Sequence, residues 1–238
     1  MIQITDLIKA YNKEIVLNIP ELTIREGEIF GLVGNNGAGK TTMFNIVLDL
    51  ITASKGQVTS KGIAVRDSED WKDFTGAFID ESFLIGYLTA EEYFAFIAGL
   101  RRMSKTETAE FLGRFADFFN GEILGKKKFI RDFSKGNQKK VGIVAALMGK
   151  PEIAVLDEPF ANLDPSSQFK LRRLIKEFAA ENGTTFLISD HTLENIADVS
   201  TRLIILEKGK IVRDVHKTET TLQEIEAFFK PVLEEDFV

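Results

Sequence analysis

The sequence predicts an α/β fold with a mainly parallel sheet, an antiparallel β subdomain and a helical insert. A β-branched run, a glycine-rich turn and a helical pattern follow one another over residues 29–50, which is the first half of a βαβ unit. The apolar run within 152–159 is typical of a strand that helices cover on both faces. Between these regions, residues 86–149 show a helical pattern. We therefore expect one α/β unit that a helical segment interrupts, rather than two independent domains in series.

The N-terminal part is expected to be β structure around one early helix. Gly27 supplies a turn before the apolar run 29–33, and a helical pattern over 39–50 follows it. The other strands predicted in this part are short runs: 2–8, 15–20, 57–65 and 76–79.

The helical insert carries two helix-start signals and one apolar stripe. Thr89 with Glu92, and Ser104 with Glu107, fit the capping box, in which paired side chains satisfy the free amides of a first turn. Helical spacing then predicts one apolar stripe on a single helix, made of Phe111, Leu112, Phe115, Phe118 and Phe119. We interpret this stripe as core rather than as a ligand site, because apolar helix faces are usually buried.

The C-terminal part returns to strands and helices of an α/β unit. Asp164-Pro165 opens a helix with proline at its first position, and 184–189 predicts a strand. Residues 202–212 predict a β-hairpin with a glycine turn, and a last helix is expected over 218–230. The predicted buried face of the first of these helices consists of Leu171, Leu174, Ile175 and Phe178.

Composition and charge exclude several functional classes. Thirty Lys and Arg against 36 Asp and Glu give a net charge of −6 over 238 residues, which disfavours partners held mainly by surface charge, such as duplex DNA or an anionic membrane. The absence of cysteine excludes disulfide scaffolds, thiol catalysis and cysteine metal sites. The sequence has no stretch of 18 consecutive apolar residues and no secretory signal, so we expect a cytoplasmic chain.

Residues 34–42, GNNGAGKTT, match the P-loop pattern of Gly, four residues and Gly-Lys-Ser/Thr. Glycines let successive amides turn inward around a phosphate, and the following helix adds its positive end. Lys40 supplies an ammonium group for the β- and γ-phosphates, and the Thr41 hydroxyl can ligate Mg²⁺. The alternative is a glycine-rich turn without a ligand. The candidate phosphate-binding residues are Gly34, Asn35, Asn36, Gly37, Ala38, Gly39, Lys40, Thr41 and Thr42.

Asp157 and Glu158 end the strand predicted within 152–159. Ligands of open α/β sheets bind at such carboxyl ends. Beside a P-loop, Asp157 is expected to hold magnesium and Glu158 to polarise the attacking water, because phosphoryl transfer depends on positioning and charge stabilisation. The alternative is a polar pair that only ends the strand. Together the two motifs predict a P-loop nucleoside triphosphatase core.

Four further segments resemble motifs of the ABC ATPases. Residues 133–140, FSKGNQKK, resemble the signature usually written LSGGQ, and 161–165, ANLDP, resemble the D-loop. Asp190-His191 resembles the switch-histidine loop, and Tyr11 resembles the aromatic residue that stacks on adenine. Over about residues 1–215 the motif order is similar to that of stand-alone ATP-binding subunits of ABC exporters, such as peptide-antibiotic export and immunity systems.

The resemblance implies a head-to-tail homodimer with two ATP molecules between the copies. Ser134 and the Gly136 amide, at a predicted helix start, would clamp the nucleotide bound to the other copy. Asp164 would contact the opposite P-loop, and His191 the γ-phosphate or the attacking water. Tyr11 would stack on the base.

Two departures from the family pattern concern the metal site and the signature. Asp80, followed by Glu81, stands where the family has a glutamine after the strand 76–79, and a carboxylate there can still reach Mg²⁺ or a water. Lys135 and Asn137 replace the glycine and glutamine of the signature. The expected magnesium ligands are Thr41, Asp157 and Asp80.

The resemblance also implies a domain layout and a function. We expect an ABC ATPase domain over 1–215, a helical subdomain inserted at about 86–135, and a short C-terminal helix and tail over 216–238. The chain would hydrolyse ATP to power a separate transmembrane permease that docks on the Phe-rich segment 83–119 and holds it at the inner face of the membrane. No nucleic-acid partner is expected. The alternatives are a soluble ABC ATPase that acts on ribosomes or DNA, and an ATP switch that does not hydrolyse.

Overall fold

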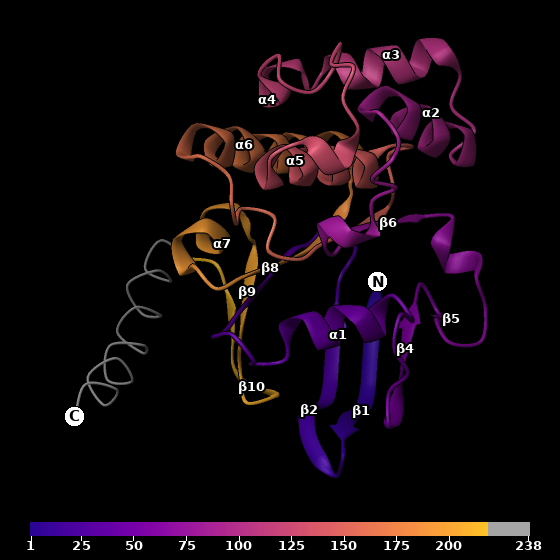
Figure 1. Ribbon diagram of the computed structural model, residues 1–238. Helices are drawn as coiled ribbons and strands as arrows, with labels where there is room; N and C mark the ends of the chain where they lie inside the picture. Colours follow the sequence, from indigo (N-terminus) through magenta and orange to yellow (C-terminus); the bar gives the residue numbers. More distant parts are fainter. Residues whose placement is uncertain (219–238) are drawn as a thin grey trace.

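The protein is described by a computed structural model over residues 1–218, and its centre is a six-stranded sheet (Figure 1). The strand order is β10-β9-β3-β8-β7-β6, and all neighbours except β9 and β10 run parallel. The predicted mainly parallel sheet is therefore confirmed. Its strands are β3 (Ile29–Val33), β6 (Thr75–Phe78), β7 (Ile153–Leu156), β8 (Thr185–Asp190), β9 (Arg202–Glu207) and β10 (Lys210–His216).

A four-stranded antiparallel sheet of order β2-β1-β4-β5 forms the predicted β subdomain. The predicted single strand over 57–65 is wrong, because Lys61 and Gly62 turn the chain at φ values of 51° and 81° and split this stretch into a hairpin. The four strands are β1 (Ile2–Tyr11), β2 (Glu14–Ile24), β4 (Lys55–Ser60) and β5 (Ile63–Ala64).

Helix α1 (Lys40–Val47) lies between the two sheets, and one core joins all three. Met43 and Phe44 of the helix share this core with Leu17 of β2 and with Phe30 and Leu32 of β3. Alternation along β3 sends Ile29 and Val33 to the opposite face and a second core. Because β3 is buried on both faces, the loop that follows it starts from a fixed position.

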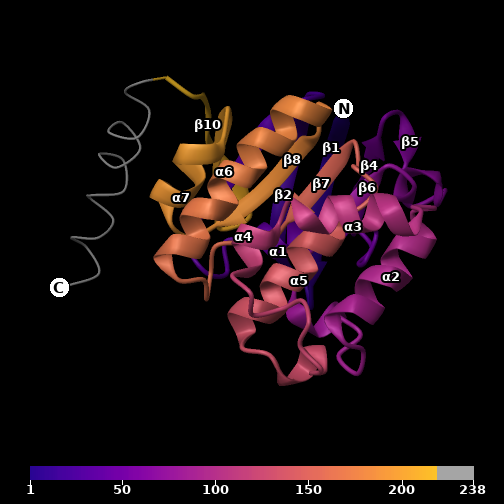
Figure 2. The same ribbon diagram turned by 90° about the horizontal axis from the view of Figure 1, so that it is seen from above.

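The second core lies under three helices, α5 (Lys135–Leu147), α6 (Pro165–Asn182) and α7 (Leu193–Val199). Seen from above, α5 and α6 cross over β7 and β8 (Figure 2). Asp164 caps α6 and proline is its first residue, as predicted, since the Asp164 carboxylate accepts a hydrogen bond from the Ser167 amide at 3.0 Å. The buried face includes the predicted Leu171, Ile175 and Phe178.

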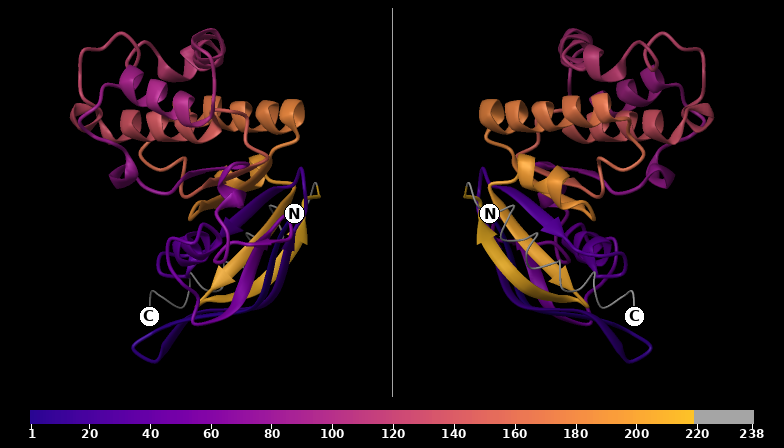
Figure 3. Two further views of the ribbon diagram at one scale, coloured as in Figure 1. Left: turned by 90° about the vertical axis from the view of Figure 1, so that its right-hand side faces the viewer. Right: turned by 90° about the vertical axis from the view of Figure 1, so that its left-hand side faces the viewer.

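The helical insert forms a separate layer at one end of the molecule, away from β1, β2 and α1 (Figure 3). Both predicted capping boxes are present, at Thr89 and Ser104. The predicted single helix under the phenylalanine stripe is wrong: Phe115 has φ −97° and ψ 6° and separates two helices, although the stripe is core as expected. The helices of the layer are α2 (Ala90–Leu100), α3 (Lys105–Gly113) and α4 (Ala116–Phe119).

Three short 3₁₀ segments complete the described chain: η1 (Asp70–Lys72), η2 (Glu81–Phe83) and η3 (Ile130–Asp132). The C-terminal helix predicted over 218–230 lies, apart from its first residue, outside the described residues. Within residues 1–218, none of the helices is long and apolar enough to cross a membrane.

Candidate functional site

The predicted phosphate loop connects the C-terminal end of β3 to the start of α1. Gly39 is the N-cap of α1 and has φ 106°, which side chains rarely adopt, and a Cβ there would lie 3.0 Å from the Val16 carbonyl oxygen. No side chain caps α1, so the free amides of its first turn point toward the loop without a side-chain partner. A helix start of this kind attracts an anion.

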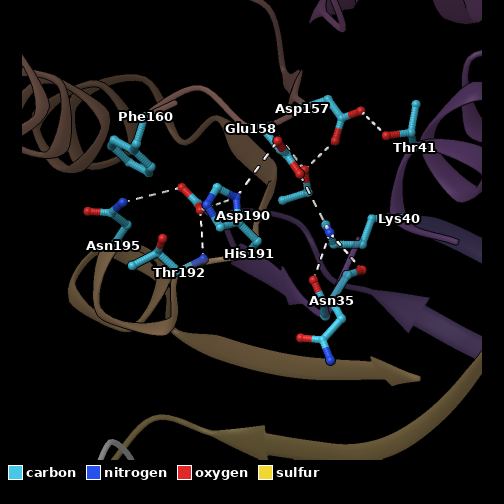
Figure 4. A network of polar contacts seen from close by, with 12 residues as sticks. Asn35, Lys40, Thr41, Asp157, Glu158, Phe160, Asp190, His191, Thr192 and Asn195 are labelled. Carbon is cyan, nitrogen blue, oxygen red and sulfur yellow. Dashed lines mark hydrogen bonds and ion pairs between the residues drawn. The ribbon is translucent and has the colours of Figure 1, made fainter. Parts of the chain in front are cut away.

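Lys40 reaches back across the phosphate loop (Figure 4). Its ammonium group is buried and donates to the carbonyl oxygens of Gly34 at 2.7 Å and Asn35 at 3.3 Å. The same nitrogen lies 3.5 Å from Oε1 of Glu158. The lysine charge is therefore held at the mouth of the loop by two carbonyl dipoles and one carboxylate.

Thr41 and Asp157 place two oxygen donors side by side. The Thr41 hydroxyl donates to Oδ2 of Asp157 at 2.6 Å, and the Ser189 hydroxyl donates to Oδ1. Burial raises the pKa of Asp157, although both hydroxyl contacts act in the opposite direction. A hydroxyl and one carboxylate suit Mg²⁺, which prefers oxygen ligands and takes the rest from water and phosphate. The pair Thr41 and Asp157 therefore fits the predicted metal.

Glu158 has an unusual backbone conformation at the end of β7. Its φ is 45°, in the left-handed region that costs a side-chain-bearing residue about 1–2 kcal/mol. Its amide donates to the Ser189 hydroxyl at 3.0 Å, and its carbonyl accepts from Lys139 at 2.8 Å. The carboxylate faces Lys40 with Oε1 and the His191 Nδ1 atom, at 3.8 Å, with Oε2. This turn presents the carboxylate toward the phosphate loop.

His191 follows β8 and is half exposed. Its Nδ1 atom lies 3.4 Å from the carboxylate of Asp190, which is buried and accepts a hydrogen bond from the Thr192 amide at 2.8 Å. Burial raises the pKa of Asp190, and the hydrogen bond from Thr192 opposes that shift. Asn195 also donates to Asp190, at 3.4 Å (Figure 4). The imidazole is thus oriented by the end of β8 and the start of α7.

These groups meet because their strands are neighbours. β3, β8 and β7 lie side by side and parallel, so the residues after their carboxyl ends share one edge of the sheet. The structure therefore brings Lys40, Thr41, Asp157, Glu158 and His191 together, as the sequence predicted (Figure 4).

Three predicted residues form a second cluster instead. Ser134 caps α5 through the Asn137 amide at 3.3 Å, and a Cβ on Gly136 would lie 2.7 Å from the Asn162 carbonyl oxygen. Hydrogen bonds from Ser167 lower the pKa of Asp164, which caps α6. In the described chain no hydrogen bond joins these residues to the phosphate loop. Their contact with a nucleotide stays a prediction.

Tyr11 and Asp80 also lie outside the cluster around Lys40. Tyr11 ends β1 with 47% of its surface exposed, and the Lys9 ammonium group lies 4.7 Å above its ring. Asp80 caps η2 by accepting from the Ser82 amide at 2.7 Å, and this contact with Ser82 lowers its pKa. Among the described residues, neither makes a hydrogen bond or ion pair with Lys40, Thr41 or Asp157. The metal contact of Asp80 stays a prediction.

Sequence reasoning missed two residues of the site. Ser189 links Asp157 to the backbone of Glu158, and its signal was a hydroxyl residue at the end of an otherwise apolar strand. Lys139 holds the Glu158 carbonyl oxygen, and its signal was a lysine pair inside a helix that is otherwise largely apolar.

The comparison with known families decides the identity of this fold and site. The sequence profile described as "ABC transporter" matches residues 17–161. The chain belongs to the ABC transporter ATP-binding family. Its ABC ATPase relatives include the Bacillus subtilis (strain 168) protein named "Uncharacterized ABC transporter ATP-binding protein YhaQ", 33% identical over 89% of this chain and 70% of that protein. "Bacitracin transport ATP-binding protein BcrA" of Enterococcus faecalis is 32% identical over 92% of this chain and 70% of its own length.

A solved ABC ATPase structure has the same architecture. The ATP-binding cassette MJ0796, described as dimeric and bound to ADP and Pi in a post-hydrolysis state, matches with a TM-score of 0.79 and 27% identity. The match covers 91% of this chain and 98% of that chain. The predicted ABC ATPase fold and the resemblance stated from the motifs are thereby confirmed.

Proposed function

We propose that this ABC ATPase binds MgATP, hydrolyses it to ADP and phosphate, and thereby powers a separate transmembrane permease. The observation that carries the proposal is that Lys40, Glu158 and His191 lie close together at the N-terminus of α1, which no side chain caps. One cluster thus contains an ammonium group that can bind phosphate, a carboxylate that can orient a water, and an imidazole that can form a hydrogen bond. That set suits in-line phosphoryl transfer to water.

Each group has a role that its position allows. The amides of residues 34–42 and the Lys40 ammonium group bind the β- and γ-phosphates, in exchange for the Gly34 and Asn35 carbonyl contacts of Lys40. Glu158 orients the attacking water and accepts its proton, and His191 donates a hydrogen bond to the γ-phosphate or the water. Thr41 and Asp157 would hold Mg²⁺, and the bound ion would supply positive charge beside the phosphate oxygens.

The second cluster supports a homodimer in which each copy completes the site of the other. Ser134 and Gly136 lie at the start of α5, which favours an anion, and Asp164 lies at the start of α6. Among the described residues, none of the three has a hydrogen bond to the phosphate loop. A head-to-tail pair related by a twofold axis would bring each cluster to the other copy's nucleotide. The dimeric state of the similar cassette MJ0796 supports this arrangement.

A groove of about 520 Å³ supports the docking of a permease. It lies between the residues that follow α1, β6, α2 and α5 and is lined mainly by apolar side chains, Phe83 and Leu100 among them, both more than 60% exposed. We propose that a short cytoplasmic helix of a membrane subunit binds there and holds the cassette, with its helical subdomain at about 86–135, at the inner face of the membrane. Co-purification with ribosomes or DNA instead of a membrane protein would favour the soluble alternative.

The direct test of the proposed reaction is steady-state phosphate release by the purified chain and by Glu158→Gln. The wild type should hydrolyse ATP, and the variant should bind ATP while its turnover falls about 10²–10⁴-fold, because the carboxylate that accepts the proton is gone. Wild-type turnover in Glu158→Gln would remove Glu158 from the mechanism. An inactive wild type that binds ATP would favour the switch that does not hydrolyse.

A further inference from the structure

The strained backbone of Glu158 is held by two side chains from other elements. Ser189 of β8 accepts from its amide at 3.0 Å, and Lys139 of α5 donates to its carbonyl oxygen at 2.8 Å. A left-handed conformation of a glutamate persists only where surrounding contacts determine it. The carbonyl oxygen also accepts from the Ala161 amide at 3.3 Å within the same turn, so Lys139 is the side chain from another element that holds it.

The burial of Lys139 costs free energy, because its ammonium group loses contact with water. It is only 5% exposed, and its ammonium group lies 5.8 Å from the centre of the Phe78 ring. A buried lysine needs a charged partner or several acceptors. The carboxylate of Glu81 lies 3.6 Å away, with a side chain only 10% exposed, and provides that partner. Oε1 of Glu81 makes no hydrogen bond among the described residues, so Lys139 is what compensates its buried charge.

The pair of Lys139 and Glu81 joins two parts of the molecule. Glu81 begins η2 directly after Asp80, which lines the groove between the residues that follow α1, β6, α2 and α5. The same Lys139 ammonium group donates to the carbonyl oxygen of Glu158. A chain of two contacts, 3.6 Å and 2.8 Å long, thus runs from the edge of the groove to the backbone that aims the carboxylate at Lys40.

We propose that Lys139 is a positioning residue for hydrolysis, which keeps Glu158 in its left-handed conformation and is itself held in place by Glu81. This inference rests on the proposed function, in which Glu158 orients the attacking water. Lys139 does not touch the nucleotide site directly, so its loss should change turnover rather than nucleotide affinity. A ligand in the groove that displaced Glu81 would weaken the contact of Lys139 with the Glu158 carbonyl oxygen.

The test compares Lys139→Met, Lys139→Arg and Glu81→Gln with a matched lysine elsewhere. Lys170 of α6 also donates to a main-chain carbonyl, that of Asp117 at 2.9 Å, and Lys170→Met serves as the control. We expect kcat of Lys139→Met to fall about 10- to 100-fold, the loss that misplacement of a reacting group brings, with ATP affinity within about twofold of the wild type. Lys139→Arg should recover part of kcat, Glu81→Gln should lower it to an intermediate value, and Lys170→Met should leave it unchanged.

The decisive comparison repeats Lys139→Met in the Glu158→Gln background. If Lys139 acts through Glu158, residual hydrolysis there should not fall further, because two residues that work as one unit are not additive. An equal fold-loss in both backgrounds, an unchanged kcat, or a loss confined to ATP affinity would overturn the positioning role. If Lys139→Met does not fold, the same comparison is made with Glu81→Gln. Wild-type turnover in Glu158→Gln would instead contradict the proposed function itself.

Discussion

At the scale of single residues, charge at the phosphate loop is kept in place before any nucleotide binds. Lys40 is buried, yet three oxygen atoms surround its ammonium group within 3.5 Å. Two of them are carbonyl oxygens of the loop itself, so a phosphate can replace them without leaving a charge unpaired. The third belongs to Glu158, whose carboxylate is one-third exposed and faces the loop. The lysine therefore couples the binding of phosphate to the position of the carboxylate.

Lys40→Ala should weaken ATP binding about 10- to 100-fold, the worth of one charge-assisted contact. Nucleotide affinity measured by calorimetry checks this. Lys61→Ala is the matched control, because Lys61 forms an exposed ion pair with Glu152 at 2.5 Å and lies outside the site. Equal ATP affinity in Lys40→Ala and the wild type would contradict the role of the loop as a phosphate cradle.

The sequence predicts those residues of the site that lie close together along the chain and form a recognisable motif. Glycines and Lys40 fall within nine consecutive positions, and Asp157 and Glu158 are adjacent at a strand end. Ser189 and Lys139 lie 31 and 19 positions from Glu158 and reach it only through neighbouring elements. A polar residue in an apolar stretch marks each of them in the sequence, but the atoms that they contact are set by tertiary structure.

At the scale of elements, helix starts set the geometry of both clusters. α1 begins at a glycine without a capping side chain, whereas α5 and α6 begin at Ser134 and Asp164, whose side chains accept from their own first turns. These capping side chains could be predicted from the sequence, because a cap and the amides that it binds lie within four consecutive residues. The break at Phe115 could not be predicted, since the apolar period of 3.6 continues across it although its backbone leaves the helical conformation.

Asp164→Ala should destabilise the nucleotide-free chain by about 1 kcal/mol, the usual loss when a helix N-cap is removed. Hydrogen bonds from Ser167 lower the pKa of Asp164 in the folded state. A lowered carboxyl pKa contributes stability above the unfolded value of about 4, and that contribution is lost as the pH falls through the still lower folded value. The difference between the two chains in urea unfolding should therefore be constant between about pH 5 and 8.

Two outcomes would contradict the capping role of Asp164. One is a difference from the wild type that disappears between pH 8 and 5. The other is an equal loss in Glu177→Ala, a control on the same helix that gives up only an exposed ion pair with Arg173.

At the scale of the whole molecule, α5 takes part in two surfaces, because Gly142 and Ala145 line the groove and Lys139 contacts Glu158. The candidate nucleotide site lies at the carboxyl ends of β3, β7 and β8, and the groove lies between the residues that follow α1, β6, α2 and α5. The α/β order predicted this sheet edge as the site, because neighbouring parallel strands end there. The groove could not be read from sequence, since its lining comes from distant segments that meet only in the fold. In the proposed homodimer, a second copy supplies Ser134 to this site.

The solution mass of Glu158→Gln with and without MgATP, followed by sedimentation, tests this closure. Because ATP is bound and not hydrolysed, the variant should become a dimer with ATP and remain a monomer with ADP or without nucleotide. Glu158→Gln combined with Ser134→Arg should bind ATP and stay monomeric, since the larger side chain blocks the contact between copies. A Glu158→Gln chain that binds ATP and remains a monomer would contradict the shared site, as would a dimer that forms equally well without nucleotide.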